Sequence, residues 1–462
     1  MTGPKAERKM KLGMFMREAG HHIAAWRTPE APRDPGNSMA HNIAVAQLAE
    51  KGLFDMLFCA DTMGIWGGDK EELSRLCRVA WIEPLTLLSG IATATRHIGL
   101  VCTSTTTYDH PYSLARRFQS LDVMSGGRAG WNLVTSANRA DGANFGAERH
   151  MAKADRYRRA SEFAAVVKGL WNSWEDDAFI QDKASGLFFE PSKLHVLGHE
   201  GEFFKVRGPL NVPRSAQGHP VMVQAGASED GRELAAATAE VIFVATPTIE
   251  LAREFYADIR ARMVRHGRNP DHLKVMPGAA ILVGRTDEEA AEKYARLQKL
   301  IHPQLGVRQL SNYIDYDLSR FDIDGPLPEI PRDEVSNSRV DLLVDWARRD
   351  NLTIRQLYEA IAGGRGHFTI QGSPTTIADT LEEWFMTGAA DGFNFLSPTI
   401  PGGVKDFIDL VIPELQRRGL FRTEYEGTTL RENLGLPFPS RGAGQVTPEA
   451  SDGGTAELVA VR

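Results

Sequence analysis

The sequence predicts an α/β protein, a (β/α)₈ TIM barrel enlarged by insertions. Two observations lead to this fold class. The chain has 462 residues, of which 42% are hydrophobic, enough for one large core. Short apolar runs rich in β-branched residues alternate along the chain with segments of helical periodicity. This alternation is typical of βαβ units whose strands form a parallel sheet.

The predicted elements follow one another in regular order. Glycine ends two of the helices, at Gly52 and at Gly126-Gly127, where the chain can leave the helix without a steric penalty. The predicted helices cover 39–51, 84–95, 112–124, 155–174, 250–267 and 375–387. The predicted strands cover 11–18, 54–61, 97–107, 128–136, 220–228, 240–245, 274–284 and 392–397.

One barrel domain accounts for most of the chain, from about residue 10 to 437. Residues 287–366 hold more helices than one crossover needs, so we expect an insertion over the barrel mouth. Residues 185–213 lack a helical period and predict a surface hairpin. The tail at 440–462 is rich in Gly, Ser, Ala and Pro, which predicts disorder. We also expect residues 1–9 to be a disordered tail.

Charge and hydropathy exclude several classes of function. The formal net charge is -7 and Lys and Arg form no block, so we expect no grip on nucleic acid. No apolar run approaches the roughly 20 residues of a membrane span. The first residues are polar and lead straight into a strand-like segment, unlike a secretory signal. We therefore expect a cytoplasmic protein.

Cysteine and histidine usage predicts neither a disulfide framework nor a metal site. Three cysteines are too few to form a disulfide framework in so long a chain. Cys59 and Cys102 lie in apolar runs, where a small buried thiol is expected. His21 and His22 are adjacent, so on an extended segment they point apart and cannot chelate one ion. A single-metal hydrolase is disfavoured.

Polar residues gather after the predicted strands, where a TIM barrel carries its chemistry. Asp61 ends an apolar strand and either caps the following turn or faces the mouth. Thr105-Thr106-Thr107 either fills the strand or turns some hydroxyls inward. Asn132 lies mid-strand, where an amide is costly to bury without a hydrogen bond. Each of these signals alone leaves the reaction open.

A small-residue turn precedes the helix that starts near Glu229. In Ala225-Gly226-Ala227-Ser228, Ser228 is a good N-cap, which is the structural interpretation. The functional one is that exposed backbone N–H groups bind a phosphate. An exposed helix-end charge contributes only about 0.3–1 kcal/mol, so a phosphate needs further donors. Tyr157 is a candidate donor, or else a half-buried packing residue.

Together these stretches form an ordered set of motifs. The most specific is SGGRAGWNLVTS, at 125–136; the others lie at 20–27, 58–61, 105–112, 155–157, 208–213, 223–228, 391–394 and 425–431. In this set the chain resembles the family of nitrilotriacetate, EDTA, pristinamycin and dibenzothiophene-sulfone monooxygenases, within the bacterial luciferase-like superfamily. The resemblance runs through nearly all of residues 10–437.

The resemblance implies FMN bound at the carboxyl ends of the strands. The positions that match the family's flavin contacts are Asp61, Thr107, Tyr157 and Ser228. Asn132, whose amide suits the pyrimidine edge of a flavin, and Ala227 adjoin them. The chain departs from the family at one place: Lys153 stands four residues before the tyrosine, where a histidine is usual, and His150 is nearby. Either could take the histidine's place at the phosphate.

The resemblance also implies a two-component reaction. A separate NAD(P)H:flavin reductase supplies FMNH₂, which reacts with O₂ to a C4a-hydroperoxyflavin that oxygenates a small organic substrate. The chain has no GxGxxG after its first strand, so we expect no nicotinamide site in it. The segment 287–366 is a natural lid. A homodimer or homotetramer is expected from the same resemblance.

The substrate is not identified, because related proteins oxidise chelators, sulfones, alkanes and heterocycles. His22, Trp26 and Arg27 are candidates to face it, or else residues that pack the loop. Two alternatives stay open. One is a deazaflavin-dependent dehydrogenase of the same superfamily, which transfers hydride without oxygen. The other is a non-catalytic flavin-binding subunit, as occurs in luciferase-like heterodimers.

Overall fold

Parallel strands form the centre of the molecule. The computed structural model describes residues 8–65, 69–136, 138–147, 149–330, 338–364 and 366–439. Within them, one parallel sheet has the order β10-β9-β11-β1-β2-β3-β4-β7-β8. Its strands are β1 (Lys11–Met16), β2 (Met56–Cys59), β3 (Gly99–Thr105), β4 (Ala129–Val134), β7 (Val221–Gln224), β8 (Val241–Val244), β9 (Lys274–Val283), β10 (Phe368–Gly372) and β11 (Gly392–Leu396).

The sheet closes on itself because β8 also pairs with β9, from Val241 opposite Lys274 to Val244 opposite Pro277. Eight strands thus form a closed barrel, which confirms the predicted fold class. Each predicted strand is present but shorter than expected, since the residues after its carboxyl end leave the ladder for a loop. The sequence pattern does not predict β10, which pairs with the second half of β9.

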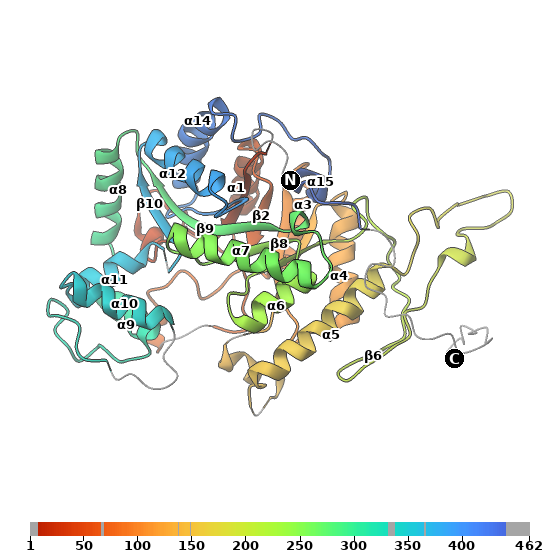
Figure 1. Ribbon diagram of the computed structural model, residues 1–462, viewed down its shortest axis with the longest axis horizontal. Coiled ribbons are helices and arrows are strands. Elements are labelled where there is room, and N and C mark those ends of the chain that lie inside the picture. Colours follow the sequence, from red (N-terminus) through yellow and green to blue (C-terminus); the bar gives the residue numbers. More distant parts are fainter. Residues whose placement is uncertain are drawn as a thin grey trace.

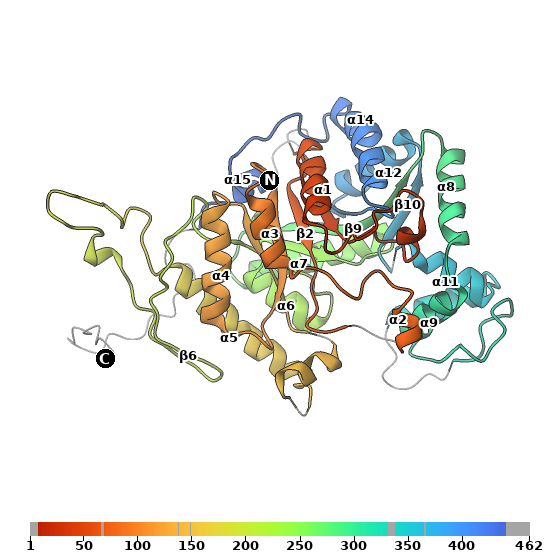
Figure 2. The same cartoon turned by 180° about the vertical axis from the view of Figure 1, so that it is seen from behind.

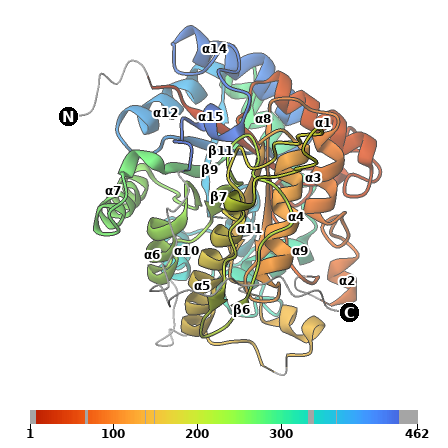
Figure 3. The same cartoon turned by 90° about the vertical axis from the view of Figure 1, so that its right-hand side faces the viewer.

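Helices surround the strands, as Figure 3 shows. Side-chain caps start many of them, such as Ser38 at α1 and Thr248 at α7. The outer helices are α1 (Met39–Lys51), α3 (Pro84–Ala92), α4 (Pro111–Met124), α5 (Lys153–Trp171), α6 (Glu229–Thr238), α7 (Ile249–Arg265), α12 (Pro374–Met386) and α14 (Ile412–Arg417). Shorter helical segments are α2 (Lys70–Leu73), α13 (Gly402–Asp406), the π-helix Phe407–Val411, and 3-10 turns at Ala25–Arg27, Arg139–Phe145, Pro191–Lys193 and Pro270–His272.

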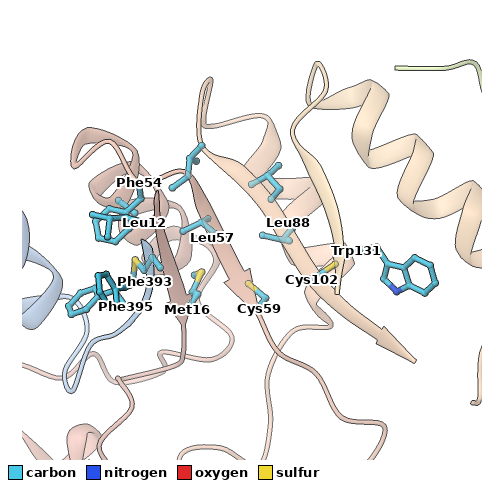
Figure 4. Close-up of a cluster of buried hydrophobic side chains, with 14 of the residues drawn as sticks. Leu12, Met16, Phe54, Leu57, Cys59, Leu88, Cys102, Trp131, Phe393 and Phe395 are labelled. Atoms are coloured by element: carbon cyan, nitrogen blue, oxygen red, sulfur yellow. The ribbon is translucent and has the colours of Figure 1, made fainter. Parts of the chain in front are cut away.

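Two apolar layers stabilise the barrel. The outer layer lies between strands and helices, and Figure 4 shows part of it, with Leu57 and Cys59 of β2 and Leu88 of α3. The inner layer fills the barrel with side chains from alternate strand positions. The short helix α15 (Leu430–Leu434) closes the amino-terminal end, where Leu430 lies so near Gly99 that an added Cβ would be 2.4 Å from its Cδ1. The opposite, carboxyl-terminal end is left for a site.

Four helices occupy the segment in which the sequence predicts an insertion. They are α8 (Asp287–Lys299), α9 (Pro303–Ile314), α10 (Ser338–Arg349) and α11 (Ile354–Ala362). The last three have a core of their own, which also contains Ile23 and Ala24 from the loop after β1. These helices therefore stand beside the carboxyl-terminal end of the barrel, at the left of Figure 1.

An arm projects at the other end of the molecule, as Figures 1 and 2 show from opposite sides. It contains the two-stranded hairpin of β5 (His199–Glu200) and β6 (Lys205–Val206), in the segment for which a surface hairpin is expected. Of the predicted tails, 440–462 and 1–7 lie outside the described residues. Arg8 and Lys9 are described and lie against the barrel, where Arg8 pairs with Asp391. None of the described helices is long and apolar enough to cross a membrane.

Candidate active site

A cavity of about 270 Å³ opens at the carboxyl ends of β2, β3, β4 and β7. This is the end of the barrel at which the sequence places the polar strand ends. The lining combines hydroxyl, amide and carboxyl groups with a few apolar side chains. Its residues are Asp61, Thr62, Met63, Thr103, Ser104, Thr105, Leu133, Val134, Thr135, Ser136, Asn138, Asp141, Tyr157, Gln224, Ala225 and Gly226.

Two buried amides have unused acceptors: Gln224 lines this cavity, and Asn132 contacts the lining residue Thr103. β3 and β4 pair Thr103 with Asn132, and the Asn132 Nδ2 donates to Thr103 Oγ1 at 2.7 Å. The Gln224 Nε2, at the end of β7, donates to the carbonyl of Gly231 at 3.2 Å. Among the described residues, Asn132 Oδ1 and Gln224 Oε1 are buried without a hydrogen-bond partner. Buried acceptors of this kind are costly unless a ligand or water satisfies them.

The wall formed by β4 is held in a constrained conformation. Ser136 has a φ of 45°, a region that non-glycine residues seldom occupy, and its hydroxyl donates to Thr105 Oγ1 at 2.7 Å. The guanidinium of Arg156 on α5 donates to the carbonyls of Thr135 at 3.0 Å and Ser136 at 2.5 Å. Thr107 also bonds to the Thr135 carbonyl, at 2.9 Å. Thr107 thus supports this wall, while Thr105 lines the cavity.

Two hydroxyl groups meet at the cavity rim, on the side of α5 and α6. The Tyr157 hydroxyl lies 3.2 Å from Ser228 Oγ, and Ser228 caps α6 by accepting from the Gly231 N–H at 3.3 Å. The structural interpretation of Ser228 as an N-cap is therefore confirmed, and its hydroxyl also faces that of Tyr157. Ala227, the residue before it, accepts from Arg232 through its carbonyl at 2.9 Å.

Lys153 and His150 differ in their surroundings. Lys153 lies at the start of α5, with its Nζ 3.2 Å from Asp230 at the start of α6 and 5.9 Å from the centre of the Tyr157 ring. His150 forms a hydrogen bond of 2.8 Å to the Tyr108 hydroxyl. The structure thus places Lys153 in contact with Tyr157 and the first turn of α6, and His150 in contact with Tyr108.

Two carboxyl groups stand on the opposite rim. Asp61 accepts from the Trp81 Nε1 at 3.2 Å, and burial raises its pKa against the effect of that hydrogen bond. Burial also raises the pKa of Asp141, which accepts from Asn138 at 2.8 Å. A negative charge on Asp141 also raises the pKa of Asp61, because two like charges disfavour each other. This rim can therefore hold a proton more readily than an exposed pair of aspartates.

The three candidates for substrate contact lie elsewhere. His22 is buried, its Nε2 3.1 Å from Gln298 Oε1 of α8, and burial lowers its pKa to about 4 despite that hydrogen bond. Arg27 donates to the carbonyl of Leu300, and Trp26 is 39% exposed. They join the loop after β1 to α8 and its end, and they do not line the cavity described above.

Several cavity residues have no counterpart in the sequence prediction: Thr103, Asp141 and Gln224 above all. Thr103 carries a readable signal, because it is a polar residue at an inward position of a strand already predicted. Gln224 does not, because it ends β7 on the side that faces α6, where it donates to the carbonyl of Gly231. Asp141 comes from a 3-10 turn in the loop after β4, and its partner Thr62 comes from the loop after β2. Only the folded loops bring these two together.

Comparison with known proteins agrees with this geometry. Residues 14–391 match the model of the family described as luciferase-like monooxygenase. The chain is 48% identical to N-acetyl-S-(2-succino)cysteine monooxygenase of Bacillus subtilis over 95% of its length and 99% of the relative's. It is 48% identical to nitrilotriacetate monooxygenase component A of Aminobacter aminovorans, over 94% and 98%. A riboflavin lyase solved with modified FMN matches with a TM-score of 0.81 and 31% identity, over 93% and 97%.

The family expected from the sequence motifs is thereby confirmed. The matches cover the barrel, the inserted helices and α15, so they extend far beyond the cavity residues. The chain belongs to the luciferase-like monooxygenase family and is an enzyme, a monooxygenase.

Proposed function

We propose that this enzyme binds reduced FMN in the cavity between β2, β3, β4 and β7 and uses O₂ to oxygenate a small organic substrate. A separate NAD(P)H:flavin reductase supplies the FMNH₂, and the reaction takes place in the cytoplasm. One observation carries the proposal. Asp61, Tyr157 and Gln224 line one cavity at the barrel mouth, Ser228 lies against Tyr157 and Asn132 against the lining residue Thr103, and the amide oxygens of Asn132 and Gln224 are unsatisfied.

The residues present suit the chemical parts of FMN. The pyrimidine edge of a flavin carries N–H groups, which match the unused acceptors Asn132 Oδ1 and Gln224 Oε1. The phosphate end suits the first turn of α6, where Ser228, Tyr157 and the positive charge of Lys153 gather. Asp61 lines the cavity, and Thr107 lies behind the lining residue Thr135, to whose carbonyl it donates. These features support the assignment of Asp61, Thr107, Asn132, Lys153, Tyr157, Ala227 and Ser228 to the flavin site.

When bound, reduced FMN supplies the electrons that activate O₂; the protein supplies position and exclusion of water. The Tyr157 and Ser228 hydroxyls fix the phosphate end, while the buried amides orient the ring. Burial raises the pKa of Asp61 at the cavity rim, against the hydrogen bond from Trp81. Helices α8–α11 stand beside the barrel mouth. We propose that they act as a lid that limits the entry of water.

The substrate search begins with the compounds named for the two relatives at 48% identity, nitrilotriacetate and N-acetyl-S-(2-succino)cysteine. The purified chain alone should not oxidise NADH. Addition of a free-flavin reductase and FMN should start O₂ consumption, with hydrogen peroxide released when substrate is absent. Robust NADH oxidation by the chain alone, after removal of contaminating reductase, would overturn the need for a second component.

The same measurements separate the two alternatives. A deazaflavin-dependent dehydrogenase would transfer hydride without consuming O₂. A non-catalytic flavin-binding subunit would bind FMN but give neither product nor substrate-dependent O₂ uptake. Both outcomes are distinguishable from monooxygenation, in which O₂ uptake and product appear together.

We also propose that the chain forms a homodimer or homotetramer. The projecting arm exposes Ile180, Leu187 and Phe188, the last of them 62% exposed, which is unusual for a surface in permanent contact with water. A second copy of the chain, packed against the arm, would bury these side chains. Sedimentation should give a multiple of 51.0 kDa; a single-chain mass at every concentration would contradict this.

A further inference from the structure

Two arginines beside the barrel mouth share a single carboxylate. Arg17 is the first residue after β1, and its Nη1 lies 3.8 Å from Glu18 Oε1. Arg78 comes from the segment that follows α2, and its Nε lies 4.0 Å from Glu18 Oε2. These are the ion pairs of the two arginines within the described part of the chain. Two positive charges therefore face one negative charge.

The pair also has unused hydrogen-bond donors. The Arg78 side chain is only 9% exposed; its Nη2 donates to the carbonyls of Gly20 at 2.9 Å and His21 at 2.6 Å. Its Nη1 and the Nε of Arg17 are buried and find no acceptor among the described residues. A buried donor without a partner costs about 1–3 kcal/mol, and more when it is charged. Glu18 Oε2 is also buried without a hydrogen-bond partner, so two donors face one unmatched acceptor among the described residues. The excess of donors favours an additional anionic acceptor.

The arginines stand above an apolar floor inside the barrel. Phe15, Phe58 and Phe243 point inward and pack edge-on or tilted, with ring centres 5.0 to 5.6 Å apart. The Arg17 guanidinium lies 5.5 Å from the Phe15 ring centre, and the His21 ring lies 4.6 Å from it. His21 also lies against Phe15 and His367 is stacked on Phe243, so Phe15 and Phe243 are only 7% and 8% exposed. The apolar part of a ligand whose charged end is at the arginines would contact the ring edges that remain exposed.

The position relative to the flavin cavity follows from the strand register. Met16 pairs with Cys59, so Arg17 is level with Ala60, the residue before Asp61, which lines the cavity. Burial, reinforced by the charges of Arg17 and Arg78, lowers the pKa of His21 well below its usual value. His21 is thus neutral and adds a polar group without a charge. The Asp61 carboxyl accepts a hydrogen bond from Trp81.

We infer that Arg17 and Arg78 form a carboxylate-binding subsite for the substrate, whose apolar part lies on Phe15, Phe58 and Phe243. The substrate is therefore an organic acid, held with one carboxylate at the guanidiniums and its oxidisable atom toward the flavin cavity. This inference rests on the proposed function, because it takes the neighbouring cavity to be the flavin site. It concerns specificity, and the FMN contacts do not depend on it.

Equilibrium binding to the FMN-loaded enzyme tests the subsite. The charged probes are nitrilotriacetate and N-acetyl-S-(2-succino)cysteine, measured by calorimetry beside their neutral amide counterparts. We expect at least one charged probe to bind about tenfold or more tightly than its amide. Arg17→Gln should abolish that difference, and Arg17→Lys should restore part of it. Arg75→Gln is the matched control, because Arg75 pairs with Glu71 on the exposed side of the same segment.

A second variant keeps the subsite testable if Arg17→Gln does not fold. Glu18→Gln removes the internal carboxylate that competes for the arginines, so affinity for the charged probe should rise. A fall would show that Arg17, Arg78 and Glu18 are a structural cluster and would overturn the subsite. Equal binding of charged and neutral probes, or unchanged binding in Arg17→Gln, would overturn it too. FMN affinity and peroxide release from FMNH₂, measured in the same variants, report on the proposed function separately.

Discussion

The hydroxyl oxygens of Tyr157 and Ser228 lie 3.2 Å apart, although the two residues belong to different helices and are 71 positions apart in the chain. α5 presents Tyr157 from its second turn, and Ser228 is the N-cap of α6, where it accepts from the backbone N–H of Gly231. A phosphate at this point would accept from both hydroxyls and from the helix end.

The first prediction tests this phosphate grip. The double variant Ser228→Ala, Tyr157→Phe removes two hydroxyl donors and leaves the backbone amides. Because a hydrogen bond to a charged group contributes about 1.5–3 kcal/mol, FMN affinity should fall at least tenfold. Riboflavin, which lacks the phosphate, should bind almost as before; fluorescence titration measures both.

A matched control separates cofactor binding from helix capping. Thr248→Ala removes the N-cap of α7, at the same end of the barrel, and should lower stability by about 1 kcal/mol without changing FMN affinity. Equal weakening of FMN and riboflavin in the double variant would show that Ser228 is a helix cap and no more.

The second prediction concerns Lys153, which stands where the family usually has histidine. Its side chain is 55% exposed, so solvent and salt screen its charge. Lys153→Ala should weaken FMN by about two- to fivefold at low salt and hardly at all at high salt. His150→Ala should leave FMN affinity unchanged, since His150 is engaged with Tyr108. A larger loss in His150→Ala than in Lys153→Ala would reverse the assignment.

The third prediction concerns the buried amide of Gln224. Gln224→Leu removes the unused Oε1 acceptor, so FMN and riboflavin should both bind about three- to tenfold more weakly, because the ring is common to them. This pattern is the opposite of that expected for Ser228 and Tyr157. A loss confined to FMN would place the ring elsewhere in the barrel.

The fourth prediction is a pH dependence of stability set by Glu240 and Arg431, which join β8 to the plug helix α15. Burial alone would raise the pKa of Glu240, but the charge and hydrogen bonds of Arg431 outweigh burial and lower that pKa to about 2. A carboxyl whose pKa is lower in the folded state stabilises the fold above its unfolded pKa, near 4.5, and loses this contribution as the pH falls toward 2.

Glu240→Gln should therefore lower the free energy of unfolding by about 3 kcal/mol at neutral pH, and the deficit should shrink as the pH falls below about 4.5. Urea unfolding at several pH values measures it. Glu71→Gln, at an exposed pair with Arg75, is the control and should have little effect at any pH. A deficit independent of pH would mean that the ion pair is not its cause.

The sequence predicts the barrel well because its signals are local. Alternating apolar runs, glycine stops and the Ser228 cap each fix an element from nearby residues, and the eight barrel strands follow. β10 escapes prediction although its five residues alternate between buried and exposed positions, because it is short and comes directly after the irregular helical segment predicted as the insertion. The predicted strand ends run too long, since the loop residues that form the mouth have the same β-rich composition.

The candidate site is predictable where a residue acts through its own strand or helix. Asp61, Asn132, Tyr157 and Ser228 are of this kind, and the structure brings them to one end of the barrel. Contacts that depend on how loops fold are not predictable. Asp141 reaches the cavity through a 3-10 turn, and His22 turns toward Gln298 of α8 because the inserted helices pack against its loop.

The most direct test of flavin-dependent monooxygenation is a single-turnover reaction. The purified chain is loaded anaerobically with chemically reduced FMN and a candidate substrate, without reductase or NADH, and then mixed with isotopically labelled O₂. We predict one labelled oxygen atom in the product for each FMN oxidised with coupling, and labelled water as the other product. Product that contains unlabelled oxygen, or FMN oxidation that yields only peroxide with every substrate class tested, would contradict the proposed function.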